Sequence, residues 1–144
     1  MSPGAPGLRL VRTLAAAPED VFDAWTNPAS IRVWMCPGSI QEAVAELDVR
    51  VGGRFRIVMR EPGREVVHTG EYLEVDRPRR LAFTWVSAGT RDQVTRVAIT
   101  LRRIAQRRTE LVLEHEALPD EEARGSHERG WAQIAAKLDR HLSA

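Results

Sequence analysis

A stripe of regularly spaced residues near the end of the chain is its clearest pattern. Between Asp120 and Leu142, one face of a 3.6-residue helix would carry His127, Trp131, Ile134, Ala135, Leu138 and Leu142. The other face would carry Glu128, Arg129, Gln133, Lys137 and Arg140. Asp120 suits an N-cap, and Glu121 and Glu122 place negative charge in the first turn. The pattern predicts one long amphipathic helix that buries its apolar stripe on another layer.

Most of the chain before this helix alternates between apolar and polar residues with a period of two, which is typical of β-strands. The predicted strands cover residues 8–16, 41–51, 54–60, 65–75, 81–85, 93–104 and 109–116. Turn sequences such as Gly52-Gly53 and Pro62-Gly63 separate them. Short connections predict antiparallel pairing, and the alternation predicts one covered and one solvated face.

Two short helices are predicted after the first strand. Pro18 stands near the first position of one, Asn27-Pro28 ends it, and the second runs from Pro28 to Trp34. The order of elements therefore predicts an α+β fold. A curved antiparallel sheet of about seven strands would hold the long C-terminal helix on its concave face.

Length and composition narrow the functional classes. The 144 residues suit one domain, expected over 8–144, after a disordered tail over 1–7. A net charge of +1 with mixed signs argues against a nucleic-acid partner. No apolar run approaches the roughly 20 residues of a membrane span, and the start lacks a signal-peptide core. The single cysteine, Cys36, excludes an internal disulfide, which is compatible with a cytoplasmic location.

Several short motifs, taken in order, resemble a known family. They are Pro18 to Trp25 followed by Asn27-Pro28 and Trp34; Val51-Gly52-Gly53-Arg54-Phe55; Gly70 to Val75 with Pro78, Arg80-Leu81 and Phe83-Thr84-Trp85; and His127 to Trp131. The chain is similar to the START-like (SRPBCC) superfamily, in the branch of the activator of heat-shock-protein-90 ATPase. The resemblance implies a helix-grip fold with a hydrophobic cavity between the sheet and the long helix. It implies no single activity, since the superfamily hosts lipid binders, cyclases and co-chaperones.

Strand parity supplies candidate residues for a ligand site in that cavity. The expected ligand-binding residues are Trp34, Phe55, Met59, His68, Tyr72, Phe83, Trp85, Leu113, His115, His127 and Trp131. Three histidines and a tyrosine directed into an apolar space are more than a core needs, because buried polar groups require partners. Gly70, between two of these residues, would leave room for a ligand. The alternative for each residue is an ordinary core position.

Catalytic candidates are weak. His68, or Glu74 if it shares the inward parity of Tyr72, would be the acid or base of an enzyme. The alternative for Glu74 is a carboxylate at the rim, paired with an arginine. No dedicated catalytic motif occurs, so the sequence does not decide whether the protein is an enzyme, and no cofactor or metal site is expected.

Three functions are therefore in competition. The first is binding of a small apolar or aromatic molecule in the cavity. The second is a cyclase- or hydratase-like enzyme acting on a polyketide-type or lipid substrate. The third is a co-chaperone-like ATPase activator or stress-response interaction domain. A monomer or a weak homodimer is expected, the latter through Val58 and Val112 on the outer face.

Overall fold

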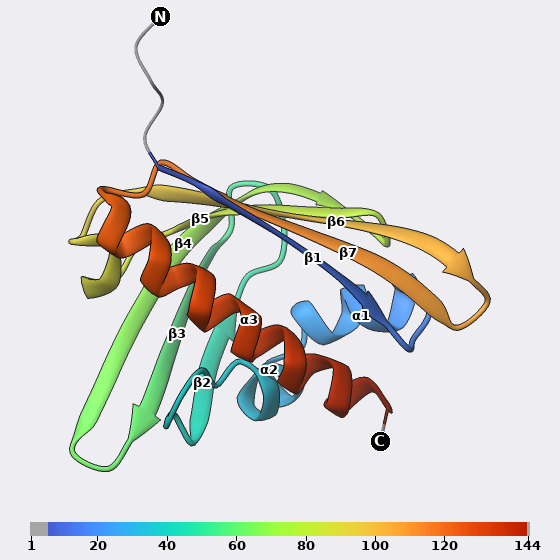
Figure 1. Cartoon of the computed structure of the whole chain (residues 1–144), viewed down its shortest axis with the longest axis horizontal. Coiled ribbons are helices and arrows are strands. Elements are labelled where there is room, and N and C mark those ends of the chain that lie inside the picture. The colour runs from blue at the N-terminus through green and yellow to red at the C-terminus, as the bar shows by residue number, and fades with distance from the viewer. Residues whose placement is uncertain (1–5, 144) are drawn as a thin grey trace, which may run out of the picture.

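The computed structural model describes residues 6–143 and contains one seven-stranded antiparallel sheet (Figure 1). The strands are β1 (Leu8–Leu14), β2 (Glu42–Leu47), β3 (Arg54–Glu61), β4 (Arg64–Asp76), β5 (Arg80–Trp85), β6 (Thr95–Ala105) and β7 (Arg108–Glu116). The helices are α1 (Pro18–Trp25), α2 (Pro28–Trp34), α3 (Glu121–Ser143) and the 3₁₀ turn η1 (Ala88–Thr90). This is the predicted α+β fold and order of elements.

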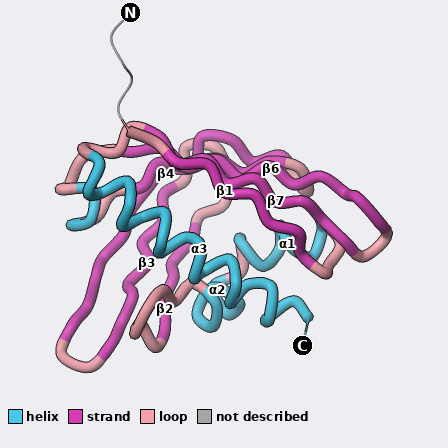
Figure 2. Tube along the Cα trace, in the orientation of Figure 1, coloured by secondary structure: helices cyan, strands magenta, loops and turns pink. Residues whose placement is uncertain are grey.

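The strand order is β1-β7-β6-β5-β4-β3-β2, so strands β2 to β7 lie side by side in the order of the sequence. Strand β1 is the exception, because it pairs with β7 at the opposite edge from β2, with Leu10 opposite Leu113. The sheet bends strongly, and α3 crosses its concave side while α1 and α2 cover one end (Figures 1 and 2). The three helices and the bend therefore enclose the space that the alternating apolar residues line.

The long helix is fixed as its sequence predicts. The side chain of Asp120 accepts a hydrogen bond from the Ala123 backbone N–H at 2.9 Å, which caps the first turn. Trp131 and Leu138 are 2% and 0% exposed, so the stripe is buried on the sheet as expected. The polar face is not entirely solvated, because Gln133 and Lys137 bond to the segment between α2 and β2.

The helical pair is attached to the far end of the sheet by charge and by aromatic packing. Arg77 and Arg103 form ion pairs with Asp23 and Glu19 of α1 at 2.8 Å and 2.6 Å. Trp34 is fully buried, and its ring meets that of Trp25 at a centroid distance of 4.8 Å. It therefore acts as part of the core rather than as a residue of an open entrance.

One strand boundary differs from the sequence prediction, and most of the predicted tail lies outside the described residues. The strand expected over 41–51 ends at Leu47, because Asp48 to Gly53 folds back on itself through backbone hydrogen bonds such as Gly53 N–H to Arg50 O at 2.8 Å. Of the tail predicted over 1–7, residues 1–5 lie outside the described range. Pro6 accepts a hydrogen bond from the Leu118 N–H at 3.0 Å, so the last residues of that segment are bonded to the domain.

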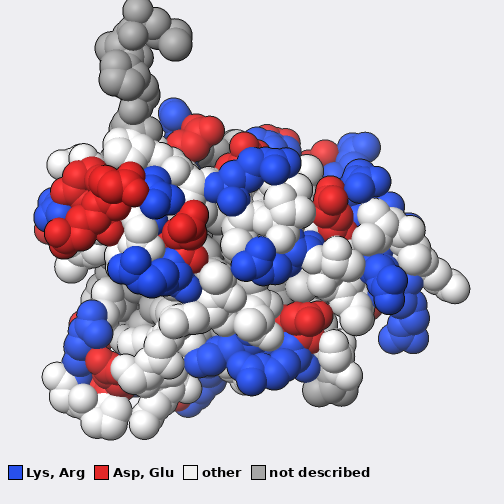
Figure 3. All heavy atoms as spheres, viewed as in Figure 1, with Lys and Arg blue, Asp and Glu red and all other residues white. Residues whose placement is uncertain are grey.

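Arginines and carboxylates are interspersed over the face of the molecule that carries α3 (Figure 3). Val58, which would have offered a dimer contact, is only 3% exposed, since it pairs laterally with Val44 and Val67. That part of the weak-dimer prediction therefore loses its structural basis. No helix among residues 6–143 is long and apolar enough to cross a membrane.

Candidate functional site

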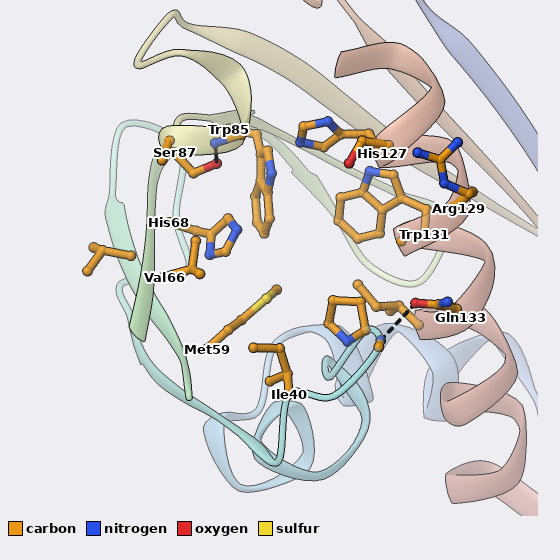
Figure 4. A pocket seen from close by; sticks show the side chains of 18 of the residues that line it. Ile40, Met59, Val66, His68, Trp85, Ser87, His127, Arg129, Trp131 and Gln133 are labelled. Atoms are coloured by element: carbon orange, nitrogen blue, oxygen red, sulfur yellow. Dashed lines mark hydrogen bonds between the residues drawn. The ribbon is translucent and has the colours of Figure 1, made fainter. Parts of the chain in front are cut away.

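A cavity of about 720 Å³ lies between the sheet and the first half of α3. Strands β3, β4 and β5 form one wall, α3 forms the opposite wall, and the segments 37–40 and 87–92 close the ends (Figure 4). The interior residues, grouped by wall, are Met59, Val66, His68 and Trp85 from the strands, His127, Gly130, Trp131 and Ile134 from the helix, and Ile40 and Ser87 from the segments.

Aromatic rings make up the deep part of this cavity. Trp85 from β5 and Trp131 from α3 have ring centroids 5.2 Å apart, at an angle of 49°. The imidazole of His68 lies against Trp85 at 4.6 Å and 34°. Tryptophan and imidazole rings offer flat, polarisable surfaces, so this wall suits a planar ligand.

His68 is held neutral at neutral pH. It is 7% exposed, and burial lowers its pKa to about 4, with a smaller effect in the same direction from nearby His127. Its Nδ1 is buried and has no hydrogen-bond partner among the described residues. The indole Nε1 of the adjacent Trp85 is also buried and has no hydrogen-bond partner among the described residues. Unpartnered buried polar atoms are uncommon, and here two adjoin one cavity.

His115 lies behind the cavity rather than in it. Its Nδ1 accepts a hydrogen bond from Trp131 Nε1 at 3.0 Å, and its Nε2 is 2.8 Å from Thr95 Oγ1. Thr95 donates to the carbonyl of Trp85 at 2.6 Å. Because an indole N–H only donates and a carbonyl only accepts, this chain assigns the proton of His115 to Nε2. The histidine thus joins the two cavity tryptophans, and burial lowers its pKa to about 3.

His127 reaches the cavity from the first half of α3. Its Nδ1 is 2.8 Å from the carbonyl oxygen of Ala123, and its ring meets that of His115 edge-on at a centroid distance of 4.9 Å. Burial lowers its pKa. Its Cε1–Nε2 edge faces Gly89.

The other half of the interior is solid. Phe55, Tyr72 and Phe83 pack on one another with centroid distances of 5.4 to 6.3 Å. A void bordered by these three rings has a volume of about 10 Å³, which is room for one water molecule at most. Of the predicted ligand-binding residues, Met59, His68, Trp85, His127 and Trp131 line the open cavity, whereas Trp34, Phe55, Tyr72, Phe83, Leu113 and His115 do not.

Gly70 does not leave room for a ligand, contrary to the sequence prediction. A Cβ atom at this position would lie 2.0 Å from the carbonyl oxygen of Thr84 and 2.4 Å from the ring of Phe55. The Phe55 ring therefore occupies the space that a side chain at position 70 would need. Glycine is required here because a neighbouring strand and an aromatic ring approach the backbone closely.

Glu74 does not point into the cavity. A register shift in the pairing of β4 with β5 lies between Tyr72 and Glu74 and interrupts the parity that predicted it. Its carboxylate instead pairs with Arg80 at 2.8 Å, and Arg80 also bonds Thr100. Of the two weak catalytic candidates, only His68 lies at the cavity.

Other reactive groups in the described chain are separate from the cavity. Cys36 is buried, and burial raises the pKa of its thiol, which lowers its nucleophilicity at neutral pH. Residues 6–143 contain no group of three or more histidine, cysteine or carboxylate side chains arranged to hold a metal ion.

Sequence reasoning missed the loop residues that close the cavity. Gln133 accepts a hydrogen bond from the Gly38 N–H at 2.7 Å, and Lys137 bonds the Cys36 carbonyl, so α3 fixes the segment between α2 and β2. Both residues fall on the polar side of the helix in the sequence pattern. Ser87, the N-cap of η1, and Gly89 form the other end. The one available signal was the Pro37-Gly38 turn, whose Gly38 N–H needs an acceptor that a polar residue of the helix, Gln133, supplies.

Solved structures share this architecture. Protein CV1439 from Chromobacterium violaceum is 25% identical, with a TM-score of 0.84 over 96% of this chain and 97% of that chain. Protein MLL2253 from Mesorhizobium loti is 27% identical, with a TM-score of 0.78 and the same coverage. PFC0360w, an HSP90 activator from Plasmodium falciparum, is 19% identical, with a TM-score of 0.76 over 95% of this chain and 96% of that chain, and its likeness concerns the fold alone.

The sequence itself gives the family. No curated protein matches the chain at a significant level. A family model described as "Activator of Hsp90 ATPase homolog 1-like protein" matches residues 15–143, which is nearly the whole chain. The two expectations drawn from the sequence, the helix-grip fold and the branch of the superfamily, are thus confirmed. The chain belongs to the activator of Hsp90 ATPase homologue 1-like family.

Proposed function

We propose that the protein binds a small, largely aromatic molecule in the cavity between the sheet and the first half of α3. The cavity itself, at about 720 Å³, is the observation that carries the proposal. Ligand sites are commonly clefts of about 300–1,000 Å³, lined by apolar and aromatic side chains with a few polar groups. The cavity is partly open to solvent, so a small molecule can reach its aromatic wall.

The distribution of packing supports the same reading. The half of the interior around Phe55 and Phe83 is filled, so the molecule does not lack residues for a solid core. The open half is bounded by rigid walls, since His115 links Trp131 to the strands through Thr95. A cavity with fixed aromatic walls is pre-organised for a ligand, which lowers the entropic cost of binding.

Two helix glycines offer a matched test. Gly130 lines the cavity, and a Cβ atom there would meet only Pro37 at 3.9 Å. Gly125, one and a half turns earlier, lies outside the cavity, and its Cβ would meet only the Arg129 side chain at 3.5 Å. Replacing either glycine favours the helix by up to about 1 kcal/mol. Gly130→Leu places a side chain in the cavity, and Gly125→Leu does not.

The measurement is fluorescence titration with N-phenyl-1-naphthylamine, an uncharged probe. We expect saturable binding by the native protein and by Gly125→Leu, and at least tenfold weaker binding by Gly130→Leu. Both variants should unfold at or above the native temperature. Absence of saturable binding to the native protein, or equal binding by both variants, would rule out the proposal.

A second candidate is binding to an Hsp90-type ATPase, which the description of the family supports. The assay is the ATPase rate of a purified Hsp90 homologue with increasing amounts of this protein. We expect at least a twofold increase if this function applies. An unchanged rate at tenfold molar excess would exclude it. Gly130→Leu separates the two candidates, because it narrows the cavity and leaves the outer surface unchanged.

A further inference from the structure

The two ends of the cavity differ in polarity. His127 and Ser87 lie together at one end, whereas Ile40 and Met59 lie at the other, beneath the tryptophan wall (Figure 4). A ligand held here would have an orientation, with its polar group toward η1. The chemistry of that group depends on what the polar end offers it.

His127 offers a hydrogen-bond acceptor. The contact of its Nδ1 with the Ala123 carbonyl, at 2.8 Å, requires the proton to be on Nδ1, because a carbonyl oxygen only accepts. In the neutral ring, Nε2 then carries a lone pair and no proton. No hydrogen bond of this nitrogen to another group is found among residues 6–143, and the ring lines the cavity beside Gly89.

The interior of the cavity carries no charge. Its charged lining residues are all exposed rim residues, namely Arg64, Glu65, Asp92 and Arg129. Burial lowers the pKa of both His68 and His127, so both rings are neutral at neutral pH. A charged group brought to the tryptophan wall would lose its hydration without meeting an opposite charge, which is costly.

Resting on the proposed function, we propose that the cavity selects uncharged aromatic molecules bearing a hydroxyl group, which donates a hydrogen bond to Nε2 of His127. Phenols and enols of fused-ring compounds are the chemical class that fits. The rings lie along Trp85 and Trp131, and the hydroxyl points toward η1. An ether of the same skeleton fits the walls but has no proton to donate.

Three probes test this selectivity by displacement of N-phenyl-1-naphthylamine at neutral pH. They are 2-naphthol, its methyl ether 2-methoxynaphthalene, and the anion naphthalene-2-sulfonate. We expect 2-naphthol to bind about fivefold tighter than the ether, which is the effect of one net hydrogen bond. The sulfonate should bind at least tenfold more weakly than 2-naphthol.

A variant assigns the effect to one atom. His127→Phe keeps a ring at this position and removes the acceptor, so 2-naphthol should lose its advantage while the ether keeps its affinity. The matched control is His141→Phe, at the far end of α3, where the native ring bonds Ser30 at 2.8 Å. In this control the advantage of 2-naphthol should persist.

The outcomes separate this inference from the function on which it rests. If the native protein binds 2-naphthol and its ether equally, or if His127→Phe keeps the preference, the role of His127 is refuted and cavity binding stands. Sulfonate binding as tight as that of 2-naphthol would refute selection for uncharged ligands. If N-phenyl-1-naphthylamine and all three probes fail to bind, both proposals fall.

Discussion

Mild acid should destabilise this protein through its buried histidines. His68 and His115 are 7% and 0% exposed, and burial lowers their pKa values from 6.5 to about 4 and about 3. Unfolding restores the ordinary pKa, so the unfolded chain takes up protons that the folded chain refuses. Stability is therefore greatest above pH 6.5 and falls as the pH drops from 6.5 toward 4.

The size of the effect follows from the linkage between protonation and folding. At pH 5, an unfolded histidine with a pKa of 6.5 is 1.5 pH units below that value, which corresponds to about 2 kcal/mol per group. His68 and His115 together account for about 4 kcal/mol, a large part of the 5–15 kcal/mol that stabilises a typical domain. Carboxylates contribute little at this pH, since in the unfolded chain they protonate mainly below about 4.5.

The assay is urea denaturation at pH 7.5 and at pH 5.0, followed by circular dichroism. We expect the free energy of unfolding to be about 4 kcal/mol lower at pH 5.0. His68→Phe keeps the ring beside Trp85 and removes one titrating group, so its loss between the two pH values should be about 2 kcal/mol smaller. A change below about 1 kcal/mol in the native protein would show that the histidines are not held neutral by burial.

Two further substitutions test the packing and the hydrogen-bond chain. Gly70→Ala should destabilise the protein by about 3 kcal/mol or more, because the new methyl group would overlap a backbone oxygen and the Phe55 ring. The control, Gly125→Ala, should stabilise it by up to about 1 kcal/mol. Equal melting temperatures of these two variants would contradict the close approach at Gly70. Thr95→Val should cost about 1–3 kcal/mol by leaving His115 Nε2 unpaired, whereas Thr13→Val at an exposed strand position should stay within about 0.5 kcal/mol. If Thr95→Val is as stable as Thr13→Val, the hydrogen bond between Thr95 and His115 does not stabilise the protein.

The fold could be predicted from the sequence because its strongest patterns are local. Alternation fixes the strands, a 3.6-residue period fixes α3, and Asp120 marks where that helix begins. The end of β2 was harder to predict from the sequence, because Val49 and Val51 continue the alternation although the backbone turns back after Leu47. Local pattern does not reveal where an alternating segment leaves the neighbouring strand.

The site was only partly predictable, for two physical reasons. Parity places Phe55 and Met59 on the same face, yet one meets the filled core and the other the cavity, because their position along the strand decides what lies opposite. Glu74 matches its alternative prediction, a carboxylate paired with an arginine, because a register shift interrupts the parity beyond Tyr72. Neither the bend of the sheet nor the shift leaves a mark on the hydrophobic pattern.

The division of the interior into a filled half and an open half has a consequence for how such proteins diverge. In the filled half, Trp34, Leu81 and Phe83 are enclosed by other residues. Residues such as Met59 and Ile134 border empty space, so changes of size at these positions meet less resistance. Proteins built on this scaffold can therefore differ in the shape of the cavity while the architecture around it persists.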